Sequence, residues 1–236
     1  MAETSQLNLP LLAPSQAQKT VTVNEALARI DGLAQMVLAS RSVTLPPVAA
    51  AEGTAYGVPP GAVNDWAGQD GRVAIFANGG WVFATPKRGW RAFVLDESSP
   101  VLHDGTVWQA GAVALSAHGA GLMLRVAEFD HAVGAGTTSV TTGLIPAGVM
   151  VIAVTARVTV AITGTASSWA LGNPGAVDRF GAGLGLAQGS YARGMLGTPM
   201  TYWSATPLTL TAAGGDFAGG GIRLAVHYID IGVPSL

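Results

Sequence analysis

The chain has 236 residues, of which only 11% are charged, with a formal net charge of −2 and no cysteine. Soluble domains average about 25% charged residues, so much of this surface must be uncharged or covered by other subunits. Low charge combined with high hydrophobicity excludes a disordered chain. The arginines are scattered singly, which argues against a nucleic-acid partner. The absence of cysteine excludes disulfides and thiolate metal sites.

Residues 1–19 lack a basic start followed by a long apolar core, so we expect no secretory signal. The longest apolar run, residues 148–162, is interrupted by Thr155, Arg157 and Thr159 and is too short to cross a bilayer. We therefore expect that the protein does not insert into a membrane and is synthesised inside the cell. It would be released only within a larger particle or by lysis.

The first element is a helix expected over residues 22–41. Thr22 and Glu25 have the spacing of a capping box. Apolar positions then alternate spacings of four and three, at Val23, Leu27, Ile30, Ala34 and Val37. Such a seam is typical of a coiled coil, although a helix packed on its own β domain explains the pattern equally well. Gly32 weakens a free-standing helix by about 1 kcal/mol relative to alanine, so this helix needs a partner surface.

Residues 45–112 predict an antiparallel β meander rich in tryptophan and glycine. Strands at 73–77 and 81–84 flank Asn78-Gly79-Gly80, a hairpin signal. Each tryptophan here is either core or a flat platform for a sugar. A module of roughly 65 residues has little else for a core, which favours the core for Trp81 and Trp90 and leaves Trp66 and Trp108 open.

A Gly/Ala-rich stretch at 113–121 is interpreted as a linker, and residues 122–236 as a second β domain. Apolar residues alternate with polar ones from Val154 to Ile162 and again from Leu224 to Tyr228. Seven or eight short strands between turns suit an antiparallel sandwich or jelly roll. The chain is thus expected to be mainly β, divided into an N-terminal segment (1–44), the meander (45–112), the linker and the sandwich.

Aromatic side chains are the clearest binding chemistry, because a pyranose ring stacks on tryptophan or tyrosine. The glycan-binding candidates lie in the sandwich: Trp169, Asp178, Arg179, Tyr191, Tyr202 and Trp203. Tyr202 and Trp203 are adjacent, so one should face the core and the other solvent. Asp178 and Arg179 could hold a sugar hydroxyl or simply form a loop-stabilising salt bridge. No nucleophile motif, cofactor motif or metal-ligand spacing is found, so we expect no enzyme, cofactor or metal.

The run QAQK…NEALARID together with the Gly-Trp pairs, within residues 5–110, closely resembles a domain family of formerly unknown function. That family occurs in prophages and gene transfer agents of alphaproteobacteria. The segments ITGTASSWALG, DRFGAGLG and IRLAVHY look like the β-sandwich that often follows it. The resemblance implies a particle-surface component, a head spike or a fibre, that touches host-surface polysaccharide.

On this hypothesis the chain is assembled in the bacterial cytoplasm as a homo-oligomer, a trimer or a pentamer. Residues 1–44 anchor it to capsid-vertex, spike or fibre components and pair its subunits, and the sandwich binds host capsule polysaccharide. Two alternatives remain open. One is a capsule depolymerase or esterase that uses a sandwich carboxylate such as Asp178. The other is a structural adaptor whose aromatic residues are all core.

Overall fold

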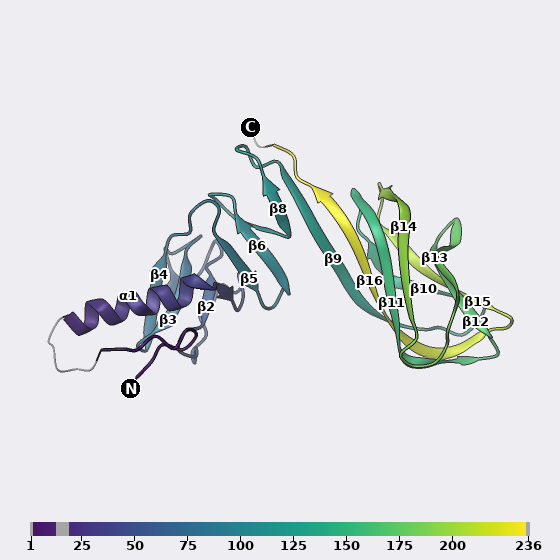
Figure 1. Cartoon of the computed structure of the whole chain (residues 1–236), viewed down its shortest axis with the longest axis horizontal. Helices are drawn as coiled ribbons and strands as arrows, with labels where there is room; N and C mark the ends of the chain where they lie inside the picture. Colours follow the sequence, from purple (N-terminus) through teal and green to yellow (C-terminus); the bar gives the residue numbers. More distant parts are fainter. Residues whose placement is uncertain (1, 13–18, 235–236) are drawn as a thin grey trace. The chain divides into compact units, whose positions relative to one another are not determined.

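The computed structural model describes residues 2–12 and 19–234, and the chain divides into two compact units, Met1–Ala112 and Val113–Leu236 (Figure 1). The mainly β architecture with one short helix confirms the expected fold class. No helix in the described part of the chain is long and apolar enough to span a bilayer.

The N-terminal unit is one seven-stranded sheet covered by a helix, α1 (Lys19–Ala34). The strand order is β4-β3-β2-β1-β5-β6-β7, and β1 pairs in parallel with both β2 and β5 while the other pairs are antiparallel. The elements are β1 (Val37–Leu38), β2 (Ala55–Gly57), a 3₁₀ turn (Asn64–Trp66), β3 (Val73–Ala77), β4 (Gly80–Ala84), β5 (Arg91–Val94), β6 (Ser99–His103) and β7 (Trp108–Ala110).

Two details of the predicted helix are wrong. Thr22 lies inside α1, so the capping box is absent, and the helix ends at Ala34 because the chain turns into β1. Val37 is therefore a strand residue rather than the last position of a helical seam. Leu38 beside it is fully buried and pairs with Ala55 and Val94 in the middle of the sheet. Residues 1–44 thus supply the central strand of a sheet whose other strands come from residues 45–112.

Gly32 is the point where α1 approaches the sheet. A Cβ atom there would lie 2.7 Å from Cδ1 of Ile75 on β3, so only glycine allows this contact without a shift of that side chain. At 100° per residue, Val23 and Ile30 lie roughly opposite Gly32 on the helix. They are accordingly 40% and 52% exposed, and the predicted seam faces away from its own sheet.

The tryptophans of this unit are mostly core. Trp66 is fully buried and meets Trp81 edge-on at 5.0 Å between ring centroids and Tyr56 at 5.3 Å. Trp90 and Trp108 are half-buried against a second cluster around Leu38. The rings of Trp81 and Trp90 thus pack against the core, as the sequence favoured. Trp66, which the sequence left open, is a core residue as well.

The hairpin predicted at residues 73–84 is confirmed, with Asn78 and Gly79 as its two turn residues. Both have positive φ, 54° and 73°, which is the geometry of a type I′ turn. The carboxylate of Glu52 accepts hydrogen bonds from both turn N–H groups at 2.8 Å.

The C-terminal unit is a jelly roll with two antiparallel sheets (Figure 1). One sheet has the order β14-β11-β16-β9-β8 and the other β10-β15-β12-β13. The strands are β8 (Ala112–Leu115), β9 (Gly121–Ala132), β10 (Thr138–Ile145), β11 (Val149–Gly164), β12 (Ser168–Asn173), β13 (Ala176–Leu184), β14 (Tyr191–Tyr202), β15 (Thr206–Ala213) and β16 (Phe217–Ile231). β8 occupies part of the span expected to be a linker.

The alternation predicted for β11 holds for Val154, Ala156 and Val158, which all face the core. It fails at Val160, which is exposed, because the pairing with β16 shifts register on both sides of this residue. Ile162 is buried again beyond the irregularity. The core between the sheets also contains Trp169, Leu171, Phe180 and Tyr202.

Candidate functional site

Two of the six predicted glycan-binding residues belong to the core. Trp169 on β12 is 1% exposed, and its indole N–H donates to the carbonyl oxygen of Gly185 at 2.9 Å. Tyr202 at the end of β14 is also buried, and burial raises the pKa of its hydroxyl. Neither ring can stack on a sugar, which corrects the prediction. The expected split of Tyr202 and Trp203 between core and solvent is confirmed, since Trp203 is 85% exposed.

The structure does not join the other candidates into one site. Asp178 is exposed on β13, whereas Arg179 is half-buried and its Nε donates to Oδ1 of Asn173 at 2.8 Å. Neighbours in a strand point to opposite faces, and no ion pair joins these two residues in the described chain. Tyr191 begins β14 and Trp203 follows its last residue. The β11 positions that face the two ends of β14 are eight residues apart, so Tyr191 and Trp203 lie roughly 25–30 Å apart.

Tyr191 instead lies in a hollow on the outer face of the five-stranded sheet. The hollow has a volume of about 390 Å³. Its long side chains come from neighbouring strands, because Arg157 on β11 pairs in register with Tyr191 on β14 and with Arg223 on β16. In the next row, Arg193 pairs with Thr155, so short residues form the floor between the arginines.

The three arginines of this hollow differ in whether they form an ion pair. Nε and Nη2 of Arg223 donate to the carboxylate of Asp130 on β9 at 2.7 and 2.8 Å. These hydrogen bonds lower the pKa of Asp130 and raise that of Arg223. Arg157 donates to the carbonyl oxygen of Gly189, at 3.1 Å. Within residues 2–12 and 19–234, neither Arg157 nor Arg193 has a carboxylate at ion-pair distance.

Tyr191 is the aromatic surface of the hollow. Its side chain is exposed (59%), and the guanidinium carbons of Arg157 and Arg193 each lie 5.7 Å from the centroid of its ring. Such cation–π contacts hold the two cations beside the ring. The hollow therefore combines a flat apolar surface with two uncompensated positive charges.

Sequence reasoning selected Tyr191 but missed the arginines, which are scattered along the chain. The signal was present locally: Tyr191, Arg193 and Met195 alternate with the buried or small Ala192 and Gly194, so all three point outward. Strand pairing between β11 and β16, which the sequence does not reveal, brings Arg157 and Arg223 together.

The same sheet face is apolar beyond the arginines. Its exposed side chains there come from β9, β14 and β16: Leu122, Leu124, Val126, Met195 and Ile231. His227 separates the two regions, and its Nε2 forms a 3.0 Å hydrogen bond with Oγ1 of Thr155.

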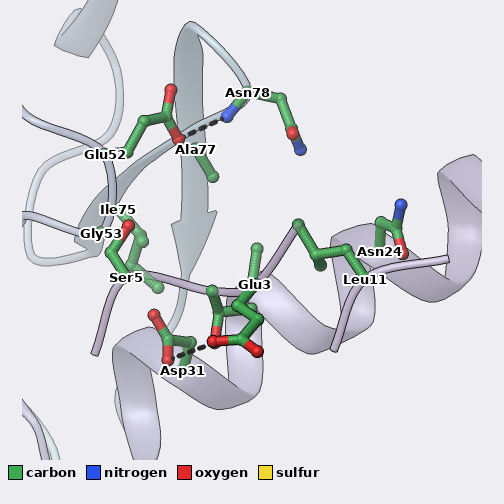
Figure 2. Close-up of a pocket in the computed structure, with 12 residues that line it drawn as sticks. Glu3, Ser5, Leu11, Asn24, Asp31, Glu52, Gly53, Ile75, Ala77 and Asn78 are labelled. Carbon is green, nitrogen blue, oxygen red and sulfur yellow. Dashed lines mark hydrogen bonds between the residues drawn. The ribbon is translucent and has the colours of Figure 1, made fainter. Parts of the chain in front are cut away.

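A second hollow, of about 270 Å³, lies in the N-terminal unit between α1, residues 3–11 and the β3–β4 hairpin (Figure 2). Its carboxylates hold the chain in place. Asp31 is 2% exposed and accepts hydrogen bonds from Oγ1 of Thr4 at 2.7 Å and from the N–H groups of Gln6 and Leu7 at 3.0 and 2.6 Å. We interpret this hollow as a structural clasp for the N-terminal segment.

Asp104 has a similar structural use in the turn before β7. It accepts hydrogen bonds from the N–H groups of Thr106 and Val107 and from Gln109. Burial opposes its charge, but these hydrogen bonds outweigh burial and hold its pKa well below the usual 3.8. No group of three or more metal-ligating side chains occurs among the residues that the structure describes.

Comparison with known proteins gives a family match within the N-terminal unit and a similarity to a solved structure. Residues 23–109, within the N-terminal unit, match a family described as "Protein of unknown function (DUF2793)". A solved structure titled "Cyanophage Pam1 capsid asymmetric unit" is 25% identical over 50% of this chain and 91% of that chain, with a TM-score of 0.36. No curated protein matches the sequence.

Proposed function

We propose that this protein is a non-enzymatic surface component, a head spike or fibre, of a phage-like particle or gene transfer agent. It attaches the particle to host cell-surface polysaccharide through its jelly-roll unit. The resemblance of residues 5–110 to prophage and gene-transfer-agent proteins supports the particle role. Jelly rolls occur in both capsid and lectin domains, so the fold is compatible with this role without establishing it.

The attachment role depends on one observation, the exposed ring of Tyr191 between two arginines in an open hollow. A sugar ring can place its C–H face on such a ring while its hydroxyl groups meet charged groups at the rim. We therefore propose the outer sheet face around Tyr191 as the glycan site, in place of the predicted Trp169 and Tyr202.

Binding of the full-length protein to purified host-surface polysaccharide, measured by isothermal titration calorimetry, tests the proposal. Tyr191→Ala should weaken binding about 5- to 50-fold, the loss typical of one aromatic stacking contact. Met195→Ala is the matched control, because Met195 is exposed on the same face of the same strand. Absence of binding to any host-surface polysaccharide would overturn the attachment role, and absence of the protein from purified particles would overturn the particle role.

Association of several copies is part of the proposed function. Val23, Leu27 and Ile30 have coiled-coil spacing and form an apolar stripe opposite the helix face that contacts the sheet. A second copy is the occupant we propose, because it would supply the same stripe at the same spacing. Native mass spectrometry should show a trimer or pentamer for the wild type and monomers for Ile30→Lys. A wild-type monomer at high concentration contradicts this part.

A further inference from the structure

We propose that the hollow around Tyr191 selects acidic polysaccharides by binding a sugar carboxylate between Arg157 and Arg193. This inference rests on the proposed function, that the jelly-roll unit binds a glycan, and it adds the chemical class of the sugar. A neutral sugar needs only the aromatic ring and hydrogen-bonding groups. Two arginines without carboxylate partners require a further explanation.

The charges of the hollow are not balanced. Arg223 is compensated by Asp130 through two hydrogen bonds and lies near Glu128, with its Nε 3.9 Å from Oε1. Arg157 and Arg193 have no such partner in the described chain, and both are exposed. The positive charge is therefore concentrated on the β11–β14 side, and the negative charge lies on the β9 side.

This arrangement of charges is unfavourable for the fold alone. Arg157 and Arg193 are diagonal neighbours on β11 and β14, and both guanidinium groups lie against the ring of Tyr191, so their like charges repel and destabilise the paired strands. Contacts with the ring of Tyr191 offset only part of the repulsion. A bound anion would remove it, since a carboxylate accepts parallel hydrogen bonds from guanidinium groups.

The shape of the hollow also favours one orientation of a bound sugar. Thr155 and Ala225 are short residues on the floor, which leaves room for a ring between Tyr191 and the Glu128 side of the hollow, on β9. A sugar with its carboxylate at Arg193 would direct its other edge toward Glu128, which accepts hydrogen bonds from hydroxyl groups but repels a second anion. The site therefore favours one carboxylate per bound ring, as in a uronic acid.

The experiment uses the full-length protein and host-surface polysaccharide in three forms: native, carboxyl-reduced, and dephosphorylated. Carboxyl reduction converts each uronic acid to the neutral sugar, and dephosphorylation removes the other anion that two arginines could bind. We expect carboxyl reduction to weaken binding about 10- to 100-fold, the range for loss of charge-assisted hydrogen bonds. Dephosphorylation should leave the affinity unchanged.

Variants connect the effect to the two side chains. Arg157→Gln or Arg193→Gln should weaken binding of the native form about 10-fold or more and should have little effect on the carboxyl-reduced form. Arg91→Gln, at an exposed arginine of the N-terminal unit, is the charge-matched control. Thermal melts of both hollow variants should give a Tm equal to or slightly above that of the wild type, since both arginines are exposed and replacing one removes like-charge repulsion.

Equal affinity for native and carboxyl-reduced polysaccharide overturns the inference while the attachment role stands. Loss of binding on dephosphorylation alone also overturns it and assigns the two arginines to phosphate. Failure to bind the native and carboxyl-reduced forms alike removes the proposed attachment role itself, which separates the two failures.

Discussion

Replacing Trp169 by phenylalanine tests whether this ring belongs to the core or to a sugar site. The indole is 1% exposed between the two sheets, and its N–H is bonded to the carbonyl oxygen of Gly185. Phenylalanine keeps an aromatic ring but has three fewer heavy atoms and no N–H donor. We expect a large loss of stability and, at temperatures where the unit is folded, unchanged affinity for polysaccharide.

The magnitude follows from two losses. Removing three buried ring atoms costs about 2 kcal/mol at roughly 0.8 kcal/mol per buried carbon group. Gly185 is exposed, so its carbonyl oxygen can accept from water, and losing the hydrogen bond costs only about 0.5–1.5 kcal/mol more. The sum, about 3 kcal/mol, is a large fraction of the ~5–15 kcal/mol typical of a domain. For a unit of this size it lowers Tm by roughly 10–14 °C.

Differential scanning calorimetry of the full-length protein measures this shift. Trp203→Phe is the matched control, because Trp203 is in the same unit but 85% exposed, and it should change the free energy of unfolding by no more than about 0.5 kcal/mol. Equal Tm shifts for the two variants, or loss of polysaccharide binding in folded Trp169→Phe, would refute the reasoning.

Three further predictions concern the framework. Asp31→Ala removes the acceptor for the hydroxyl of Thr4 and two backbone N–H groups, so amide exchange of residues 4–9 should accelerate at least about 10-fold. Gly172→Ala places a Cβ 2.1 Å from a backbone oxygen and should cost about 3 kcal/mol or more in urea unfolding, whereas Gly197→Ala, with open space around it, should cost less than about 1 kcal/mol. Because the folded-state pKa of Asp104 is lowered, its stabilising contribution is complete above its usual 3.8 and is lost as the pH falls toward the folded value. The stability difference between wild type and Asp104→Asn should therefore shrink between about pH 5 and about pH 2, and a constant difference would argue against this account.

Features set by neighbouring residues were predictable from the sequence. The hairpin at Asn78-Gly79 depends on two residues that accept positive φ, and the sandwich depends on period-two alternation in single strands. The end of α1 was not predictable, because β1 has two residues and forms through partners that begin at Ala55 and Arg91. The same limit applies to Val160, whose exposure follows from pairing with a distant strand.

The candidate site, too, was predictable from the sequence only in part. Tyr191 could be selected from the sequence because it is an aromatic residue in a polar, glycine-rich setting. The burial of Trp169 could have been inferred too, since Trp169 shares one face of a strand with the apolar Leu171 while the small residues at 168 and 170 share the other. The arginine cluster could not, because residues 157, 193 and 223 become neighbours only when β14, β11 and β16 pair in register.

The distribution of charge in the jelly-roll unit gives the strongest reason to look for function on this face. Residues 122–236 contain no lysine and five arginines. Three of these five gather at one hollow, and two of the three remain without a carboxylate partner in the described chain. The unit carries little charge elsewhere, so solubility does not explain why like charges lie side by side here. Their repulsion across paired strands destabilises the fold. An anionic ligand would remove that penalty on binding, so the feature that is least favourable for the fold is the one that a bound acidic sugar would explain.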